Sequence, residues 1–260
     1  MGEPFDAIGF KIRDEASYQA LAEQAHKRGS LTQSRRERST LHGCCWKLGD
    51  GIEVWTVLRE SSDGLLCLDC RPAFRGRYLY ALFPWEIMEY EEDGEAVVRG
   101  IVTGTDTQLI FELQNLTEVS LGALRDHPIT ATVSGLAYNA RLDDRKREAV
   151  LRPLSEGSRR RRVAENDHAV SGTVIHWRTL HNSQTTSDVV WVYLQTGAIK
   201  LEVLVNRADL EGELRPGARF SADVWLQGHI LSERELEARY EGVDVEIPRG
   251  DYWNALRREN

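Results

Sequence analysis

The sequence lacks any segment that is apolar enough to cross a membrane. No apolar run approaches the roughly 18 to 20 residues that a membrane-spanning helix requires. The N-terminus, MGEPFDAIGF, has neither the basic region nor the apolar region of a secretory signal. We therefore expect a cytoplasmic protein.

Cysteine is scarce and confined to one part of the chain. The four cysteines, Cys44, Cys45, Cys67 and Cys70, lie within the N-terminal third, and the rest of the sequence has none. A secreted disulfide-rich domain carries more cysteines over a shorter chain. We therefore expect reduced thiols.

The motifs of several enzyme classes are also absent. The sequence has no glycine-rich phosphate loop, no His-Glu-x-x-His zinc motif, no Gly-x-Ser-x-Gly nucleophile motif and no EF-hand loop. No nucleophile stands at a recognisable spacing from a partnered base, so no catalytic residue can be assigned. The sequence favours a protein that is not an enzyme and that uses no cofactor.

What the sequence does contain is enough apolar material for a folded core. Its 260 residues are 41% hydrophobic and 28% charged, which fits one large domain or two small ones. The formal net charge of -8 opposes broad electrostatic attachment to nucleic acid or anionic lipid. A local basic patch remains compatible with this balance.

The N-terminal third predicts one helix among strands. Residues 8–12 alternate apolar and polar side chains, as a half-buried strand does. A helix is expected over residues 15–28, with Asp14 as its N-cap and Gly29 at its end. Three strands follow, at residues 39–48, 52–59 and 64–70. Residues 1–92 are therefore expected to form a βαβββ module.

The rest of the chain predicts mostly strands, in two similar sets. The candidates are residues 97–103, 108–113, 129–136, 170–178, 189–195, 200–205 and 220–226. Val98–Val102 matches Val170–Val174, and the stretch ending at Ser134-Gly135 matches the one ending at Gln227-Gly228. We predict an α+β, mostly β protein in which the module precedes two small antiparallel barrel-like repeats. The expected boundaries are 93–140 for the first repeat, 141–168 for a basic polar linker, and 169–260 for the second repeat with C-terminal helices.

Two resemblances add to this interpretation. The opening FDAIGFKIRDEASYQALAEQAHKRG with GIEVW at residues 51–55 resembles one βαβββ unit of the vicinal oxygen chelate superfamily, as found in uncharacterised bacterial proteins. That family commonly has a histidine ligand and a glutamate ligand where this chain has Ala7 and Glu53, so the metal pair is incomplete. Residues 170–231 look like an OB-type barrel, through VSGTV and LRPGARFSADVWLQG. An OB fold implies binding of nucleic acid, sugar or protein, and names no ligand.

The cysteine-rich stretch suggests weak candidates for a metal site. Cys67 and Cys70 form a CxxC pair, with Cys44 and His42 upstream. On a regular strand, residues 67 and 70 point to opposite faces, so both could bind one metal only across a turn or bulge. The alternative is that these cysteines are half-buried, unliganded thiols.

Other residues suggest binding surfaces. His176, Arg178, His181 and Asn182 cluster at a strand end and in the loop after it, where barrel proteins often contact ligands. Trp225 is the candidate for an exposed stacking platform, while Trp191 is expected in the core. The run Arg159, Arg160, Arg161 and Arg162 could hold a phosphate backbone or could simply be solvated. The acidic stretch from Glu86 to Asp93 is expected to be a solvated surface, or else to meet a basic partner.

These features favour a non-enzymatic binding or adaptor protein that contacts a protein partner. Trp85, Tyr90, Trp225 and Trp253 are the aromatic residues expected to be available for that contact. The first alternative is single-stranded nucleic-acid binding through the OB-like barrel and the arginine run. The second is a degenerate metalloenzyme of the oxygen-chelate type.

Overall fold

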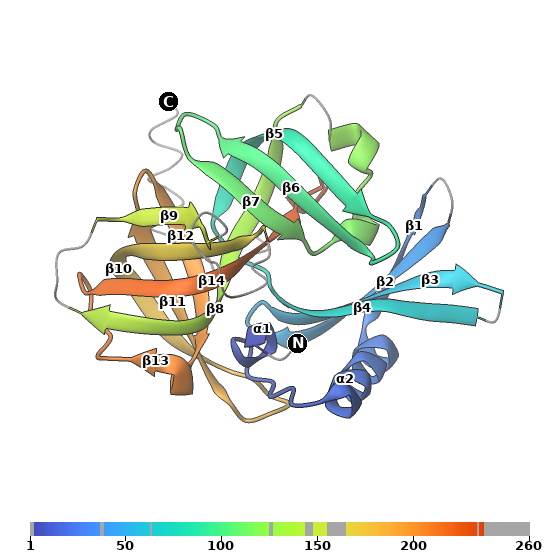
Figure 1. Cartoon of the computed structure of the whole chain (residues 1–260), viewed down its shortest axis with the longest axis horizontal. Coiled ribbons are helices and arrows are strands. Elements are labelled where there is room, and N and C mark those ends of the chain that lie inside the picture. The colour runs from blue at the N-terminus through green and yellow to red at the C-terminus, as the bar shows by residue number, and fades with distance from the viewer. Residues whose placement is uncertain are drawn as a thin grey trace. The chain divides into compact units, whose positions relative to one another are not determined.

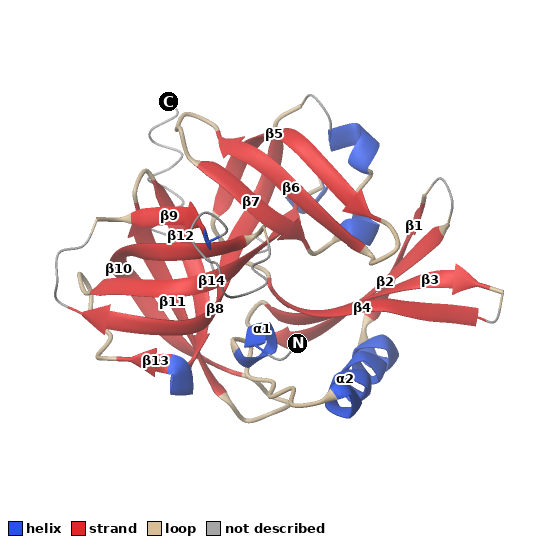
Figure 2. Cartoon of the chain, in the orientation of Figure 1, coloured by secondary structure: helices blue, strands red, loops and turns tan. Residues whose placement is uncertain are grey.

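The computed structural model describes residues 3–36, 39–62, 64–124, 127–143, 148–154, 165–232 and 234–236 (Figure 1). The chain divides into two compact units, residues 1–230 and 231–260. The first unit is built mostly of strands, with few helices (Figure 2), which confirms the mostly β, α+β class. None of the helices among the described residues is long and apolar enough to span a membrane.

The N-terminal residues form two helices rather than a strand and a helix. The expected helix is confirmed as α2 (Glu15–Arg28), in which Asp14 and Ser17 cap each other and Gly29 ends the helix. The strand expected at residues 8–12 is wrong. A short helix, α1 (Glu3–Asp6), leads into a turn in which Ile8 and Phe10 donate backbone hydrogen bonds to Phe5. Gly9, at φ +88°, takes a conformation that a strand does not use.

A four-stranded antiparallel sheet follows. Its strands, in spatial order, are β1 (Ser30–Arg35), β2 (Thr40–Gly49), β3 (Ile52–Ser61) and β4 (Gly64–Phe74). The last three confirm the strands predicted for this region. Leu21 and Ala25 of α2 share one apolar cluster with Trp46, Val54 and Phe74 of the sheet. The helix therefore covers one face of this sheet.

All other strands belong to one ten-stranded sheet. They are β5 (Leu79–Tyr90), β6 (Glu95–Val102), β7 (Gln108–Leu113), β8 (Ile129–Asp143), β9 (Val150–Pro153), β10 (Asp167–His181), β11 (Asp188–Thr196), β12 (Ile199–Asn206), β13 (Leu210–Glu211) and β14 (Arg219–Ile230). Each strand predicted beyond residue 95 lies within or overlaps one of these. The short helices η1 (Leu116–Glu118), η2 (Leu121–Leu124) and η4 (Arg207–Asp209) connect strands.

The strand pairings close two rings that share β8 and β14. One ring runs β5–β6–β7–β14–β8 and back to β5. The other runs β10–β11–β12–β8–β14 and back to β10. Each ring has one parallel pair, β7 with β14 and β12 with β8. The inward side chains of both rings belong to a single apolar core.

The register of β8 on β14 matches the predicted repeat. Gly135 pairs with Leu226, and Gly228 pairs with Val133. Gly228 lies 93 residues after Gly135, and Leu226 lies 93 residues after Val133, so the two pairs are equivalent under the predicted offset of 93. The first part of the predicted match is corrected by the pairing order. The predicted match aligned β6 with β10. In the structure, β5 pairs antiparallel with β8 in one ring, as β10 pairs antiparallel with β14 in the other, so β5 is the counterpart of β10. The two sets of strands are hydrogen-bonded to each other, and the predicted boundary at residue 92 falls between the paired strands β5 and β6.

Candidate functional site

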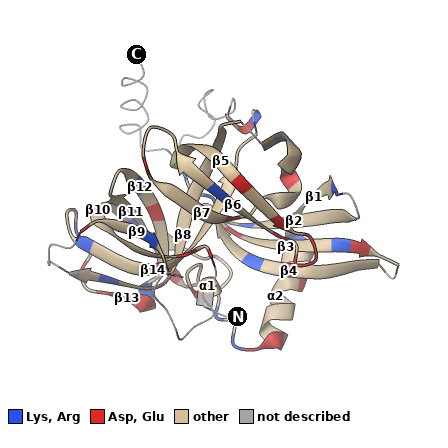
Figure 3. Ribbon diagram, turned by 45° about the horizontal axis from the view of Figure 1, so that its top comes forward, with Lys and Arg blue, Asp and Glu red and all other residues tan. Residues whose placement is uncertain are grey.

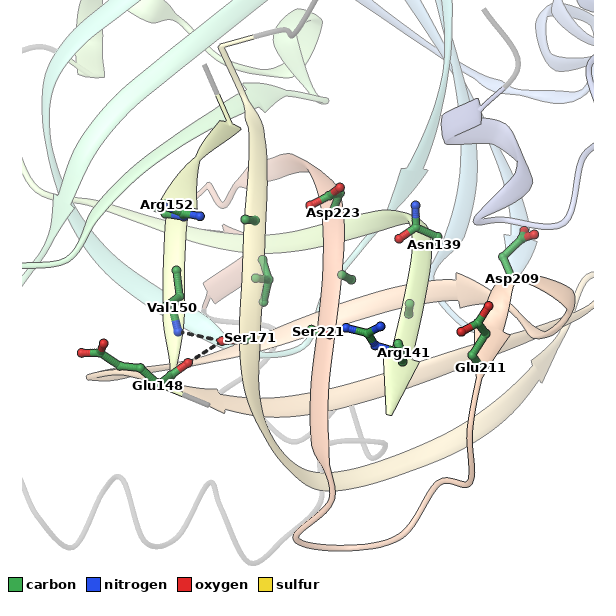
Figure 4. A pocket seen from close by; sticks show the side chains of 14 residues that line it. Asn139, Arg141, Glu148, Val150, Arg152, Ser171, Asp209, Glu211, Ser221 and Asp223 are labelled. Carbon is green, nitrogen blue, oxygen red and sulfur yellow. Dashed lines mark hydrogen bonds between the residues drawn. The ribbon is translucent and has the colours of Figure 1, made fainter. Parts of the chain in front are cut away.

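A groove of about 660 Å³ lies on the outer face of β9, β10, β14, β8 and β13 (Figure 4). The register places its residues in two rows. In one row, Ser171 lies opposite Ser221, which lies opposite Arg141. In the other, Ala169 lies opposite Asp223, which lies opposite Asn139. The groove is therefore a continuous surface built from strands that are far apart in the sequence.

The hollow exists because small side chains occupy three of the four outward lining positions on the two central strands. Ala169 and Ser171 of β10, with Ser221 of β14, form the floor, while longer side chains stand on β8 and β9. The alternate residues Val170 and Ala222 are buried in the core, as strand alternation requires. The outward positions are thus free to define the surface without disturbing the packing.

Ser171 fixes one wall of the groove. Its Oγ accepts a hydrogen bond from the backbone N–H of Val150 at 3.2 Å and donates one to the carbonyl of Glu148 at 2.6 Å. These bonds tie the start of β9 to β10, beside the floor. Both hydrogen bonds of the hydroxyl are therefore made with backbone groups.

The groove carries charges of both signs, with carboxylates in excess. Among the described residues, its lining contains four carboxylates and two guanidinium groups, namely Glu148, Asp209, Glu211, Asp223, Arg141 and Arg152. Over the described chain as a whole, acidic and basic residues are interspersed (Figure 3). Asp6, at the end of α1, lies close enough to Asp209 to feel its charge. The pKa of Asp6 is raised, first by burial and then by Asp209, although Lys11 acts in the opposite direction.

Two of the predicted site residues come together at a different place. The Arg178 guanidinium lies 5.4 Å from the centre of the Trp191 ring, and the His176 ring lies 5.9 Å from it, edge to face. Trp191 stacks on Tyr193, and Lys200 Nζ lies 5.7 Å from the Tyr193 ring. Trp191 is 5% exposed, which confirms that it belongs to the core. We call His176, Arg178 and Lys200 with these two rings the aromatic–cation patch.

The other two residues of that predicted cluster have separate surroundings. Asn182 is fully buried, and its Nδ2 donates to the carbonyl of Ile8 at 2.7 Å. It holds the N-terminal turn against the loop after β10. His181 is exposed and pairs with Asp188 across the start of β11 at 3.2 Å. These contacts suggest a structural role for Asn182 and a surface pair for His181.

Trp225 is not on the surface, so that prediction is wrong. Its side chain is only 7% exposed. The outer face of β14 at this point belongs to an apolar cluster with Phe5, Ile8 and Trp46. Strand alternation correctly placed Trp225 on the opposite face of β14 from the apolar core between the rings, but this second face is covered as well. The predicted residues Arg159, Arg160, Arg161, Arg162 and Trp253 lie outside the described residues.

The thiol candidates do not converge on a metal site. Cys44 on β2 and Cys70 on β4 are both buried, and both lie opposite Thr56 of the intervening strand β3. Their backbones are therefore two strand spacings apart, about 9.5 Å. Cysteines that share one zinc ion each lie about 2.3 Å from it. Cys67 is exposed overall, although partial desolvation of its sulfur, and after it the charge of Asp69, raises its pKa. His42 pairs with Glu60, while His26 Nδ1 lies 3.4 Å from Cys44 Sγ. No group of three or more metal-binding side chains gathers among the residues that the structure describes.

Glu53, the one matching position of the oxygen-chelate resemblance, is also engaged. Its Oε2 accepts a hydrogen bond from Trp55 Nε1 at 2.8 Å, and its Oε1 lies 3.1 Å from Arg75 Nε. The side chain is buried. Both carboxylate oxygens therefore already have partners within the chain.

The acidic stretch at the end of β5 is largely engaged with the four-stranded sheet. Glu89 pairs with Arg36, and Glu92 pairs with Arg59. Glu91 accepts a hydrogen bond from Ser39. The expectation of a simply solvated acidic surface is corrected, because these carboxylates join β5 to the neighbouring sheet. On the same strand, Phe83, Trp85 and Tyr90 are 45%, 48% and 40% exposed, as expected for Trp85 and Tyr90.

Comparison with known families finds one match. Residues 161–228 match a family described as a domain of unknown function, E. rectale Gene description (DUF3881). The matched segment contains β10 and β13 and most of β14, and so includes Ser171, Asp209, Glu211 and Ser221 of the groove. No curated protein matches the sequence. The family description names no activity.

Proposed function

We propose that this chain is a non-enzymatic, cytoplasmic binding protein whose groove takes a segment of a partner polypeptide. The observation that carries the proposal is the groove itself, a hollow of about 660 Å³ with a floor of small side chains and polar walls. Ligand sites are typically concave, with a few polar groups placed to fix the occupant. Outward side chains form the groove without any sacrifice of core packing.

The dimensions and the lining favour a polypeptide. The groove runs across β9, β10, β14, β8 and β13, whose outer members are four strand spacings apart, about 19 Å, which admits one polypeptide segment with its side chains. The described lining residues include no cysteine, histidine, tyrosine or lysine. Ser, Asn, Asp, Glu and Arg side chains suit hydrogen bonding to a peptide backbone and to its polar side chains.

The test is a selection for peptides that bind through the groove. A library of random twelve-residue peptides is displayed on phage and panned against the wild-type chain. The selected peptides are then measured against Ser221→Trp, which fills the floor, and against Ile175→Trp, an outward and exposed position of β10 beyond the groove. We expect peptides that bind the wild type and Ile175→Trp but lose at least tenfold in affinity for Ser221→Trp.

Equal binding to all three proteins, or no enrichment over the unselected library, would refute the proposal. Both substitutions place a large side chain on the outer face of a strand, where aromatic residues are well tolerated. Thermal unfolding shows whether each variant is folded. Ala169→Phe fills the same floor from β10 and replaces Ser221→Trp if that variant does not fold.

A second candidate function is binding of single-stranded nucleic acid. What favours it is the aromatic–cation patch, in which Arg178 and Lys200 lie over Trp191 and Tyr193. The closed five-strand pairing of β10, β11, β12, β8 and β14 is compatible with the OB-like barrel that we propose for this region. Affinity for a twelve-nucleotide oligothymidine should then fall steeply between 50 and 200 mM salt, and Arg178→Ala should lower it. Absence of binding at 50 mM salt would exclude this candidate.

A further inference from the structure

We propose that the groove selects a basic segment, extended in conformation and carrying Lys or Arg at alternate positions. This inference rests on the proposed function, because it specifies the chemistry of the polypeptide that the groove takes. Three features of the described residues support it: the balance of charge, the spacing of two carboxylates, and a neighbouring carboxylate.

The charge balance of the described lining residues favours a cationic occupant. Four carboxylates and two guanidinium groups give the described lining a formal charge of -2. Complementary charge steers a partner into the correct site and disfavours a partner of the same sign. The whole chain, at -8, adds to the attraction for a basic partner.

The spacing of Asp209 and Glu211 specifies where the positive charges lie. Leu210, between them, is buried, and Leu210 and Glu211 pair in parallel with Ala140 and Arg141 of β8. Asp209 and Glu211 therefore both line the groove, along its β13 side (Figure 4). Alternate residues of an extended chain lie about 6.7 Å apart and point the same way. An extended segment beside β13 can thus place one basic side chain against each carboxylate.

Asp6 strengthens the case at the α1 end of the groove. Its carboxylate is partly buried and near Asp209, and this proximity of two negative charges contributes to the raised pKa of Asp6. A lysine or arginine of the occupant placed beside Asp209 reduces this repulsion. The same position is unfavourable for an acidic side chain, which gives selectivity as well as attraction.

The test uses three fluorescein-labelled ten-residue peptides with the full chain. The first alternates Lys and Ser, the second alternates Glu and Ser, and the third has the composition of the first with its five lysines in one block. Fluorescence anisotropy at 150 mM NaCl measures their affinities. We expect the alternating Lys peptide to bind at least tenfold more tightly than the Glu peptide and about threefold more tightly than the block peptide.

Two matched variants test whether Asp209, at the end of η4, and Glu211, on β13, are responsible. Asp209→Asn with Glu211→Gln should weaken the alternating Lys peptide about tenfold, as expected for two partly exposed charge pairs. Glu23→Gln with Asp106→Asn makes the same change of net charge at exposed positions outside the groove, and should weaken it less than twofold. Equal loss in both variants, or equal affinity for the alternating and block peptides, would overturn the inference.

The peptide selection separates this inference from the proposed function. If the library yields peptides that depend on Ser221 but contain no Lys or Arg, the charge inference fails and the peptide-binding function stands. If no Ser221-dependent peptide is found and the alternating Lys peptide does not bind, both fail. Enrichment of Ser221-dependent peptides with alternating basic residues supports both.

Discussion

Neutralising Glu112 should remove much of the pH dependence of folding stability. Glu112 on β7 is buried, and its Oε1 accepts a hydrogen bond from Arg71 Nη1 at 2.7 Å. Arg71 lies on β4, so this pair joins the two sheets. Burial raises the pKa of Glu112 to about 7, against the lowering effect of Arg71, and Asp69 and Glu95 raise it further.

The direction of the effect follows from proton binding. Between pH 4.5, the ordinary pKa of a glutamate, and pH 7, the folded chain holds a proton on Glu112 that the unfolded chain has lost. The free energy of unfolding therefore falls as the pH rises through this window. A shift of about 2.5 pKa units, from 4.5 to about 7, corresponds to about 3 kcal/mol as an upper bound. The pKa values of Asp69 and Glu95 are also raised, first by burial, and they add in the same direction.

The measurement is urea unfolding of wild type and Glu112→Gln at several pH values from 5 to 8, followed by tryptophan fluorescence. The wild type should lose stability over this range, and Glu112→Gln should lose less, because glutamine keeps an acceptor for Arg71 but cannot ionise. His168, whose pKa is lowered by burial, acts in the opposite direction in both proteins and cancels in the comparison. Glu23→Gln, on the exposed side of α2, should keep the wild-type slope. Identical slopes for wild type and Glu112→Gln would refute the reasoning.

Three further substitutions test buried contacts made by the ten-stranded sheet and by the loop after β10. Trp191→Ala should lower the free energy of unfolding by about 3 to 5 kcal/mol, because it removes a buried ring and the hydrogen-bond donor to Glu202. Trp85 is 48% exposed, so Trp85→Ala should lower it by less than about 1 kcal/mol. Similar losses for the two variants in chemical denaturation would contradict this. Gly228→Ala places a Cβ 2.5 Å from the buried Phe111 ring and should lower the free energy of unfolding by about 1 to 3 kcal/mol. A Cβ at Gly122 meets nothing within 4 Å, so Gly122→Ala should leave stability unchanged. Unchanged stability in Gly228→Ala would show that the Phe111 ring can move. Asn182→Ala should lower the free energy of unfolding by about 1 to 3 kcal/mol, because it removes the hydrogen bond to the carbonyl of Ile8. His181→Ala, which removes only an exposed pair with Asp188, should leave stability unchanged. Equal melting temperatures for these two variants would refute the structural role of Asn182.

The sequence predicted elements well wherever local signals were complete. Helix α2 has a cap, an apolar side and a glycine at its end, and the seven strands predicted beyond residue 95 each lie within or overlap an observed strand. The missed strands lack these signals. β1 is mostly exposed and carries polar side chains, β9 and β13 are only 4 and 2 residues long, and β5 contains Pro84 and a bulge after it. Residues 8–12 alternate like a strand, but Gly9 turns the chain.

The candidate site could not be predicted in the same way. Ser171, Ser221 and Arg141 form one row only because β10, β14 and β8 pair in a particular register. None of these residues stands in a motif, and a groove floor made of Ala and Ser has no distinctive sequence pattern. His176 and Arg178 were recognised because they are near each other in sequence, and they do meet at Trp191. Trp225 was misplaced because alternation identifies the two faces of a strand but does not show whether both are covered.

The shared strands explain why the chain resists division into two separate barrels. β8 follows β5, β6 and β7 in sequence, yet it also closes the ring of β10, β11 and β12 through its parallel pairing with β12. β14 does the same for the first ring through β7. A chain cut between β8 and β10 would leave each half without a strand of its ring, with unpaired backbone groups along two edges. The groove crosses the same junction, since its lining lies on β10, β14 and β8, so it depends on strands from both rings.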